Sequence, residues 1–197
     1  MYVKYRHHSN QLEVIVQFSR LIIATALIAA SASVPIKAQE FHVGAVYSAD
    51  QLWGGRIGLR SDNYAQQLLP ESWLAAIGNP AISFEGALNH WQNSNNSDDK
   101  LTALTLSPVF QWQIAGEQRP LFFEAGIGVS VLDGATIGDR NLSIHFQFED
   151  RVALSWQYSS ASKARVSLAY THYSQADIDR PNDGLDFFSL NWHIPFG

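Results

Sequence analysis

The sequence predicts an all-β protein, an eight-stranded antiparallel transmembrane β-barrel of the outer-membrane type. Three observations support this prediction. Apolar and polar residues alternate with a period of two from about residue 40 onward, which indicates strands with two different faces. A segment with the layout of an export signal precedes the alternating part. The polar positions carry charges of both signs, as the interior of a small barrel requires.

The composition narrows the classes of function. The chain has 197 residues, a formal net charge of -5 and no cysteine, which fits a single domain. The acidic balance argues against nucleic acid as a partner. Without cysteine, a nucleophile must be a hydroxyl or a carboxylate. The histidines lack metal-ligand spacing, and we expect neither a metal site nor a cofactor.

Residues 1–38 have the layout of a secretory signal peptide. Basic residues precede the apolar run LIIATALIAA at 21–30, and small residues follow as far as Ala38. This order predicts cleavage after Ala38. The run is shorter than the roughly 20 residues of a spanning helix, although an uncleaved anchor is the alternative. We therefore expect residues 39–197 to form a single barrel domain.

The strands are expected between clusters of Gly, Asn, Asp and Pro. Their approximate positions are 41–48, 52–62, 80–92, 101–114, 119–132, 141–159, 163–175 and 184–196. Eight strands are enough to close a small barrel. The region 63–79 fits this pattern least and predicts a loop or a short amphipathic helix. The stretch SNNSDDK at 94–100 lacks the pattern of a calcium loop and predicts a solvated turn.

The last segment shows how completely the two faces separate. One face holds Phe188, Leu190, Trp192, Ile194 and Phe196, and the other holds Ser189, Asn191, His193 and Pro195. Segments near 104–113, 121–131 and 143–158 alternate in the same way, with Asp150 as an interruption of the apolar set. The aromatic Phe196 next to the last residue is similar to the terminal strand signal of bacterial outer-membrane proteins.

Alternation by itself does not say which face is inside, because a soluble sandwich buries its apolar face. The export signal, and Trp and Tyr near the ends of the apolar stripes, favour apolar side chains that face lipid. The charged residues of the polar parity are then expected to pair inside a narrow lumen. They are Arg56, Arg60, Glu85, Glu124, Glu149, Arg151 and Arg165.

The stretch THYSQADIDRPNDGLD, residues 171–186, contains the candidate chemistry. His172 and Ser174 share the parity of apolar residues on their strand, and Asp186 shares the parity of Phe188. All three are therefore expected on the outer wall, near the extracellular end. The simpler alternative is a polar strand end at the level of the lipid headgroups, where such residues cost little.

Hairpin geometry favours a nucleophilic site. If His172 pairs with Asp186, their Cβ atoms lie about 4.5–5.5 Å apart, and Ser174 lies opposite Gly184, where the missing side chain leaves space for a substrate. This arrangement supplies a nucleophile, a base and an orienting acid. Asn182 and backbone N–H groups of the turn are candidate oxyanion donors.

The same residues carry a family resemblance. HYSQADIDRPNDGLDFFSLNWHIPFG (172–197), with SPVFQWQI (107–114), FFEAGIGV (122–129) and IGDRNLSIHFQFEDRV (137–152), closely resembles the PagL family of lipid A 3-O-deacylases from Gram-negative outer membranes. The likeness covers the second half of the chain strongly and the first half in strand pattern only.

The resemblance implies an eight-stranded barrel with a Ser–His–Glu triad that faces the membrane. On this sequence it implies Ser174 as nucleophile and His172 as general base. The acid position holds Asp186 in place of Glu, and its shorter arm requires a closer approach of the strands or a different rotamer of the carboxylate. Family members commonly have Asn directly after the serine, where this chain has Gln175, which shifts the expected oxyanion role toward Asn182.

The sequence therefore predicts an outer-membrane serine esterase whose substrate is lipid A of lipopolysaccharide. Lipid of the outer membrane is its expected surrounding, and the oligomeric state, a homodimer included, stays open. Two rival hypotheses remain. A structural or adhesive barrel would keep the alternation without needing His172 and Ser174 outside, and a soluble periplasmic barrel would bury the apolar parity.

Overall fold

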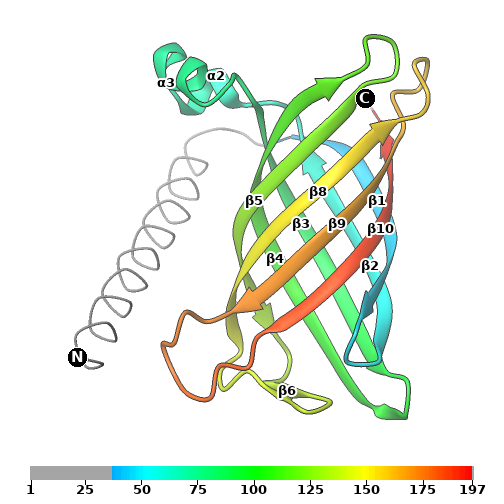
Figure 1. Ribbon diagram of the computed structural model, residues 1–197, viewed down its shortest axis with the longest axis vertical. Coiled ribbons are helices and arrows are strands. Elements are labelled where there is room, and N and C mark those ends of the chain that lie inside the picture. Colours follow the sequence, from blue (N-terminus) through cyan, green and yellow to red (C-terminus); the bar gives the residue numbers. More distant parts are fainter. Residues whose placement is uncertain (1–36, 197) are drawn as a thin grey trace, which may run out of the picture.

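A computed structural model describes residues 37–196, which form a closed barrel of eight antiparallel strands (Figure 1). The strand order around the wall is β1-β10-β9-β8-β5-β4-β3-β2, so β1 closes the barrel on β10. The strands are β1 (Ala38–Ser48), β2 (Leu52–Ser61), β3 (Ala81–Asn93), β4 (Asn96–Ala115), β5 (Leu121–Leu132), β8 (Phe146–Gln157), β9 (Arg165–Ser174) and β10 (Leu185–Pro195). The predicted fold class is confirmed. The predicted signal peptide spans residues 1–38, and its alternative is an uncleaved anchor. Residues 1–36 lie outside the part of the chain that the structure describes.

The two ends of the barrel differ. The start of β1 and the end of β10 lie at one end, which we call the terminal end (Figure 1). The opposite end, the loop end, carries the β9–β10 connection and a hairpin of β6 (Thr136–Ile137) and β7 (Arg140–Asn141). Because the number of antiparallel strands is even, the first strand starts and the last strand ends at the same end of the barrel.

The region 63–79 contains two short helices at the terminal end, α2 (Ala65–Leu68) and α3 (Glu71–Ala76) (Figure 1). Trp112 of β4 donates from Nε1 to the carbonyl of Ile77 over 2.7 Å, which ties the end of α3 to the wall. Of the two structures expected for this region, the helical one is found. No helix within residues 37–196 is long and apolar enough to cross a membrane.

Two predicted boundaries were wrong. Residues 96–100 belong to β4 instead of a turn, because the carboxylate of Asp99 accepts from Asn93 Nδ2 and from the backbone of Gly138 and thereby orders this end of the hairpin. The segment expected as one strand from 141 is interrupted, because β7 ends at Asn141 and β8 starts only at Phe146. Ser143 has a φ of 62°, which breaks the extended backbone between them.

The apolar side chains of the alternating pattern face outward on every side of the barrel. On β10 the exposed fractions are 52% for Phe188, 43% for Leu190 and 46% for Trp192, whereas Asn191 and His193 between and beside them are at most 1% exposed. Such a band of apolar side chains around a polar interior is the arrangement of barrels that span a lipid bilayer. The predicted assignment of faces is confirmed.

The charged side chains at the polar positions of the pattern form a network of ion pairs inside the barrel. Arg60 Nη2 lies 2.7 Å from Glu85 Oε2 and 3.0 Å from Glu124 Oε2, and Arg56 contacts Glu85 and Glu149 over 2.7 and 3.1 Å. Arg151 and Arg165 join the same carboxylates. A buried charge is tolerated when its partners compensate for lost hydration. The seven charged residues predicted for the lumen all belong to this network.

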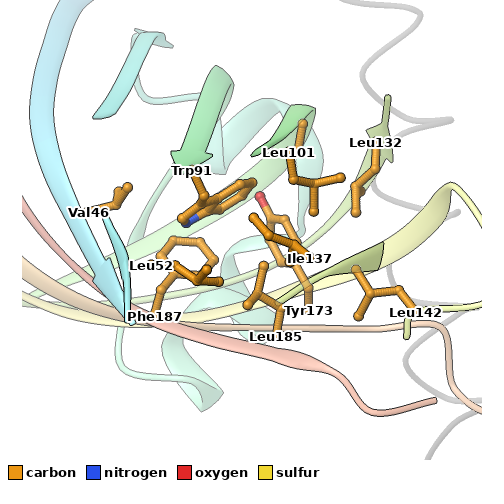
Figure 2. Packing of buried hydrophobic residues seen from close by; sticks show 11 residues of the cluster. Val46, Leu52, Trp91, Leu101, Leu132, Ile137, Leu142, Tyr173, Leu185 and Phe187 are labelled. Atoms are coloured by element: carbon orange, nitrogen blue, oxygen red, sulfur yellow. The ribbon is translucent and has the colours of Figure 1, made fainter. Parts of the chain in front are cut away.

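The loop end of the interior is apolar, which the sequence did not predict. Trp91 packs edge-on against Tyr173 and Phe187, with ring centroids 5.6 and 4.9 Å away, and Leu52, Leu185 and other buried residues surround them (Figure 2). Ile137 of β6 and Leu142 beyond β7 complete this cluster. The hairpin at the loop end is therefore anchored by burial of its own apolar side chains.

Candidate active site

The candidate site lies on the outer wall where β9 and β10 approach the loop end. His172 is directly opposite Asp186 in the register of these strands. The imidazole Nδ1 lies 2.8 Å from Asp186 Oδ1, a hydrogen-bond distance. The side chains are 36% and 44% exposed, so the pair is open to what surrounds the barrel. The expected pairing of His172 with Asp186 is thus the one that the strands adopt.

This contact determines which imidazole nitrogen carries the proton. Since a carboxylate only accepts hydrogen bonds, Nδ1 of His172 is assigned as the donor to Asp186. In the neutral ring Nε2 then has a free lone pair and can accept a proton. In this arrangement the Asp186 carboxylate orients the imidazole of His172, whose Nε2 can act as a general base.

Ser174 ends β9, two residues beyond His172, and lies opposite Phe148 of β8. Positions two apart along a strand share a face, so its hydroxyl is on the same outer wall as the imidazole. Within residues 37–196 the structure joins His172 to Asp186 but shows no hydrogen bond between Ser174 Oγ and the imidazole. Catalytic hydrogen bonds of this kind commonly close only around a substrate.

Gly184 lies against the imidazole. It has a φ of 66°, and a Cβ atom built on it would lie 2.9 Å from His172 Cε1 and 3.2 Å from the carbonyl oxygen of Tyr173. The strand ladder ends at the pair of Leu185 and Tyr173. The space left by this glycine therefore accommodates the histidine ring, where the sequence suggested room for substrate over Ser174.

The connection after Ser174 is held by side-chain amides. Gln175 is fully buried, and its side chain hydrogen-bonds both the backbone N–H and the carbonyl of Asp179. Asn182 Oδ1 accepts from the backbone of Gln175 over 3.3 Å, and its Nδ2 donates to Asp177 Oδ1 over a long 3.4 Å. The candidate oxyanion donor is thus close in structure to the residue that follows Ser174.

The β6–β7 hairpin braces the other side of the site. Arg140 forms an ion pair with Asp50, at 2.9 Å, and donates to the carbonyl of Asp183. The backbone N–H of Asn141 donates to the Asp183 carboxylate over 2.8 Å. Hydrogen bonding to Asp50 raises the pKa of Arg140 above its ordinary value. These contacts fix the segment that leads into Gly184.

Two residues of the wall beside His172 were not singled out as site residues. Tyr170 donates its hydroxyl to Asp186 Oδ1 over 2.6 Å, and Asp150 of β8 lies opposite His172 on the side away from Asp186. The signal for Asp150 was its interruption of the apolar stripe. Tyr170 lies two positions before His172, so the alternation places it on the same face. Its contact with Asp186 runs diagonally between strands and depends on the register, which the alternation does not give.

A groove of about 380 Å³ runs along the outer wall from this site. Tyr170 and His172 line it on β9, and Val152 lines it on β8. It continues over Ala125 of β5 toward Phe110 of β4. Its lining is predominantly apolar, so the histidine stands at the edge of a surface suited to hydrocarbon.

Comparisons with known proteins identify the relatives of this chain. The family model described as Lipid A 3-O-deacylase (PagL) matches residues 62–195. The lipid A deacylase PagL of Pseudomonas aeruginosa is 32% identical over 123 residues, which are 62% of this chain and 69% of that protein. The protein of the same name from Bordetella bronchiseptica is 32% identical over 111 residues, 56% of this chain and 60% of that protein.

The fold comparison extends over the barrel. The crystal structure of the outer membrane enzyme PagL superposes with a TM-score of 0.65 and 28% identity, covering 81% of this chain and 100% of that chain. The family match spans strands β3 to β10 together with the hairpin that carries His172, Ser174 and Asp186. This chain therefore belongs to the lipid A 3-O-deacylase (PagL) family.

Proposed function

We propose that this protein is an outer-membrane serine esterase that removes the ester-linked 3-O acyl chain from lipid A of lipopolysaccharide. The observation that carries the proposal is the His172–Asp186 pair on the outer wall, with Ser174 on the same face and an apolar groove beside it. A barrel without chemistry has no use for an ionisable pair among outward apolar residues. Family membership supplies the substrate class.

In the proposed reaction Ser174 Oγ attacks the ester carbonyl while Nε2 of His172 takes the hydroxyl proton. Asp186 stabilises the imidazolium that forms, through the hydrogen bond from Nδ1. The tetrahedral oxyanion is stabilised by Asn182 Nδ2 and by backbone N–H groups of the turn after Ser174. Collapse of the intermediate breaks the ester bond, and the sugar oxygen leaves with the proton from the imidazolium.

The second half of the reaction repeats these roles with water. His172 takes a proton from a water molecule, whose oxygen attacks the acyl-enzyme carbonyl. The intermediate releases Ser174, which regains its proton, and the fatty acid departs. Because the site faces outward, an acyl chain that already lies along the barrel wall reaches it without leaving the bilayer.

Mass spectrometry of lipid A from cells that express the protein tests the proposed activity. Wild type is expected to remove one hydroxyacyl chain, and Ser174→Ala is expected to leave lipid A intact. Ser97→Ala, at an exposed serine of β4, is the matched control and should act as wild type does. An unchanged lipid A with wild type, or the same loss with Ser174→Ala, would contradict the proposal.

The proposed location is tested separately. Heat-modifiable migration in gels and recovery in the outer-membrane fraction are expected for a folded barrel of this kind. Full solubility without detergent would favour the periplasmic barrel, although the outward apolar band of residues 37–196 argues against it.

A further inference from the structure

Two donors meet on one oxygen of Asp186. The hydroxyl of Tyr170 donates to Oδ1 over 2.6 Å, and Nδ1 of His172 lies 2.8 Å from the same atom. Tyr170 and Asp186 are not direct partners, because Tyr170 lies opposite Phe188 while Asp186 lies opposite His172. The two residues are diagonal neighbours on one face of the sheet. Diagonal neighbours are about 7–8 Å apart, a distance that an aromatic side chain can bridge.

The tyrosine is held at both ends. Its ring lies 5.4 Å from the ring of Phe188, and its hydroxyl reaches the carboxylate. Asp186 by itself is not constrained by burial, since its side chain is 44% exposed. A carboxylate in such a place samples several orientations. The hydroxyl of Tyr170 selects the orientation in which Oδ1 also receives the imidazole.

A membrane-interface role alone does not explain this contact. Tyrosines are common at both rims of membrane barrels, where headgroups satisfy the hydroxyl. Tyr158, at the terminal end, is an example beside Trp156. Tyr170 and Tyr158 are equally exposed, at 39% each, but the hydroxyl of Tyr170 is directed to the acid that orients the histidine.

We propose that Tyr170 is a positioning residue of the deacylase, whose hydroxyl locks the short Asp186 carboxylate against His172. This proposal rests on the proposed function. Aspartate has one methylene fewer than the glutamate that the family resemblance implies at this position, so its carboxylate has less reach toward a base on the next strand. The phenol compensates by fixing Oδ1 where Nδ1–H points, which leaves Nε2 available to Ser174.

The first test compares Tyr170→Phe with Tyr158→Phe in purified, detergent-solubilised protein acting on lipid A. Phenylalanine keeps the ring contact and removes only the hydroxyl. We expect kcat of Tyr170→Phe to fall about 10-fold, with KM changed less than about 2-fold, as for a lost hydrogen bond to a charged group. Tyr158→Phe should match wild type. An unchanged kcat in Tyr170→Phe, or an equal loss in Tyr158→Phe, would overturn the proposal.

The second test introduces the longer acid. In an Asp186→Glu background the carboxylate reaches His172 with less help, so removing the Tyr170 hydroxyl should lower kcat less than about 2-fold. The double-mutant cycle then shows a coupling between the two positions. A loss of about 10-fold in both backgrounds would refute a role for Tyr170 in compensating the short arm.

A third measurement does not depend on activity. In protein with ¹⁵N-labelled histidine, the Nδ1–H of His172 should give a slowly exchanging, downfield NMR signal that His172→Gln removes. The signal should persist in Tyr158→Phe and broaden or disappear in Tyr170→Phe. If it is unchanged in Tyr170→Phe, the positioning role fails. If wild type shows the signal but deacylates nothing, the proposed function fails and the positioning role does not.

Discussion

The hydroxyl of Tyr173 points into the barrel and donates to Glu149 Oε2 over 2.9 Å, while its chain neighbours His172 and Ser174 face outward. Asn89 donates to the same hydroxyl over 3.1 Å. The strand end that carries the candidate nucleophile and base is therefore fastened from the inside, to the charge network of the lumen.

Tyr173→Phe should destabilise the barrel. In this variant Glu149 loses a buried hydrogen-bond donor and Asn89 loses an acceptor. A lost hydrogen bond to a charged group lowers the free energy of unfolding by about 1.5–3 kcal/mol. Urea unfolding in lipid vesicles measures the loss. Tyr158→Phe, exposed on the outer wall, should unfold at the urea concentration of wild type, and equal midpoints for all three proteins would refute the anchoring.

Gly184→Ala should damage the site more than the fold. An added Cβ would lie 2.9 Å from His172 Cε1, at a φ of 66°. The backbone strain costs about 1–3 kcal/mol, and a displaced imidazole lowers turnover on the order of 100-fold. Deacylation and urea unfolding are measured together.

The control for that variant is Gly86→Ala. A Cβ there would meet nothing nearer than the carbonyl oxygen of Thr105 at 4.0 Å. Turnover is expected to stay close to wild type. A Gly184→Ala protein with full turnover would show that the contact with His172 does not constrain the ring.

Arg60→Met should be among the most destabilising single changes. Its guanidinium contacts the buried carboxylates of Glu85 and Glu124, and removal of one partner from a buried ion network costs about 3–5 kcal/mol. The measurement is again urea unfolding in vesicles. Arg119→Met, at an exposed position, should change stability by less than about 0.5 kcal/mol, so equal effects of the two variants would contradict this reasoning.

Ala125→Phe should change chain-length preference. Ala125 lines the groove that begins at His172, and a phenyl group there shortens the space for hydrocarbon. Turnover of substrates with long acyl chains is expected to fall about 10-fold relative to short ones. Leu154→Phe, exposed on the outer wall outside the groove, is the control, and a uniform loss for all chain lengths would argue against the groove as the acyl site.

Much of the fold follows from the period of two along the chain. Because successive side chains point to opposite faces, the pattern places Phe188 and Arg56 in two different sets. The export signal, and Trp and Tyr near the ends of the apolar stripes, then assign Phe188 to the outside and Arg56 to the lumen. The same parity places His172, Ser174 and Asp186 on one wall, and turn residues bound the strands. These are local properties, so they can be predicted without knowing which strands meet.

Only the tertiary structure decided which side chains of different strands contact one another. The register brought Tyr170 diagonally to Asp186 and placed Asp150 beside His172. Closure of the barrel gathered Trp91, Tyr173 and Phe187 from three strands into one apolar cluster at the loop end. Periodicity reports the face on which a side chain lies, but contacts across strands depend on register and closure, which bring together residues far apart in sequence.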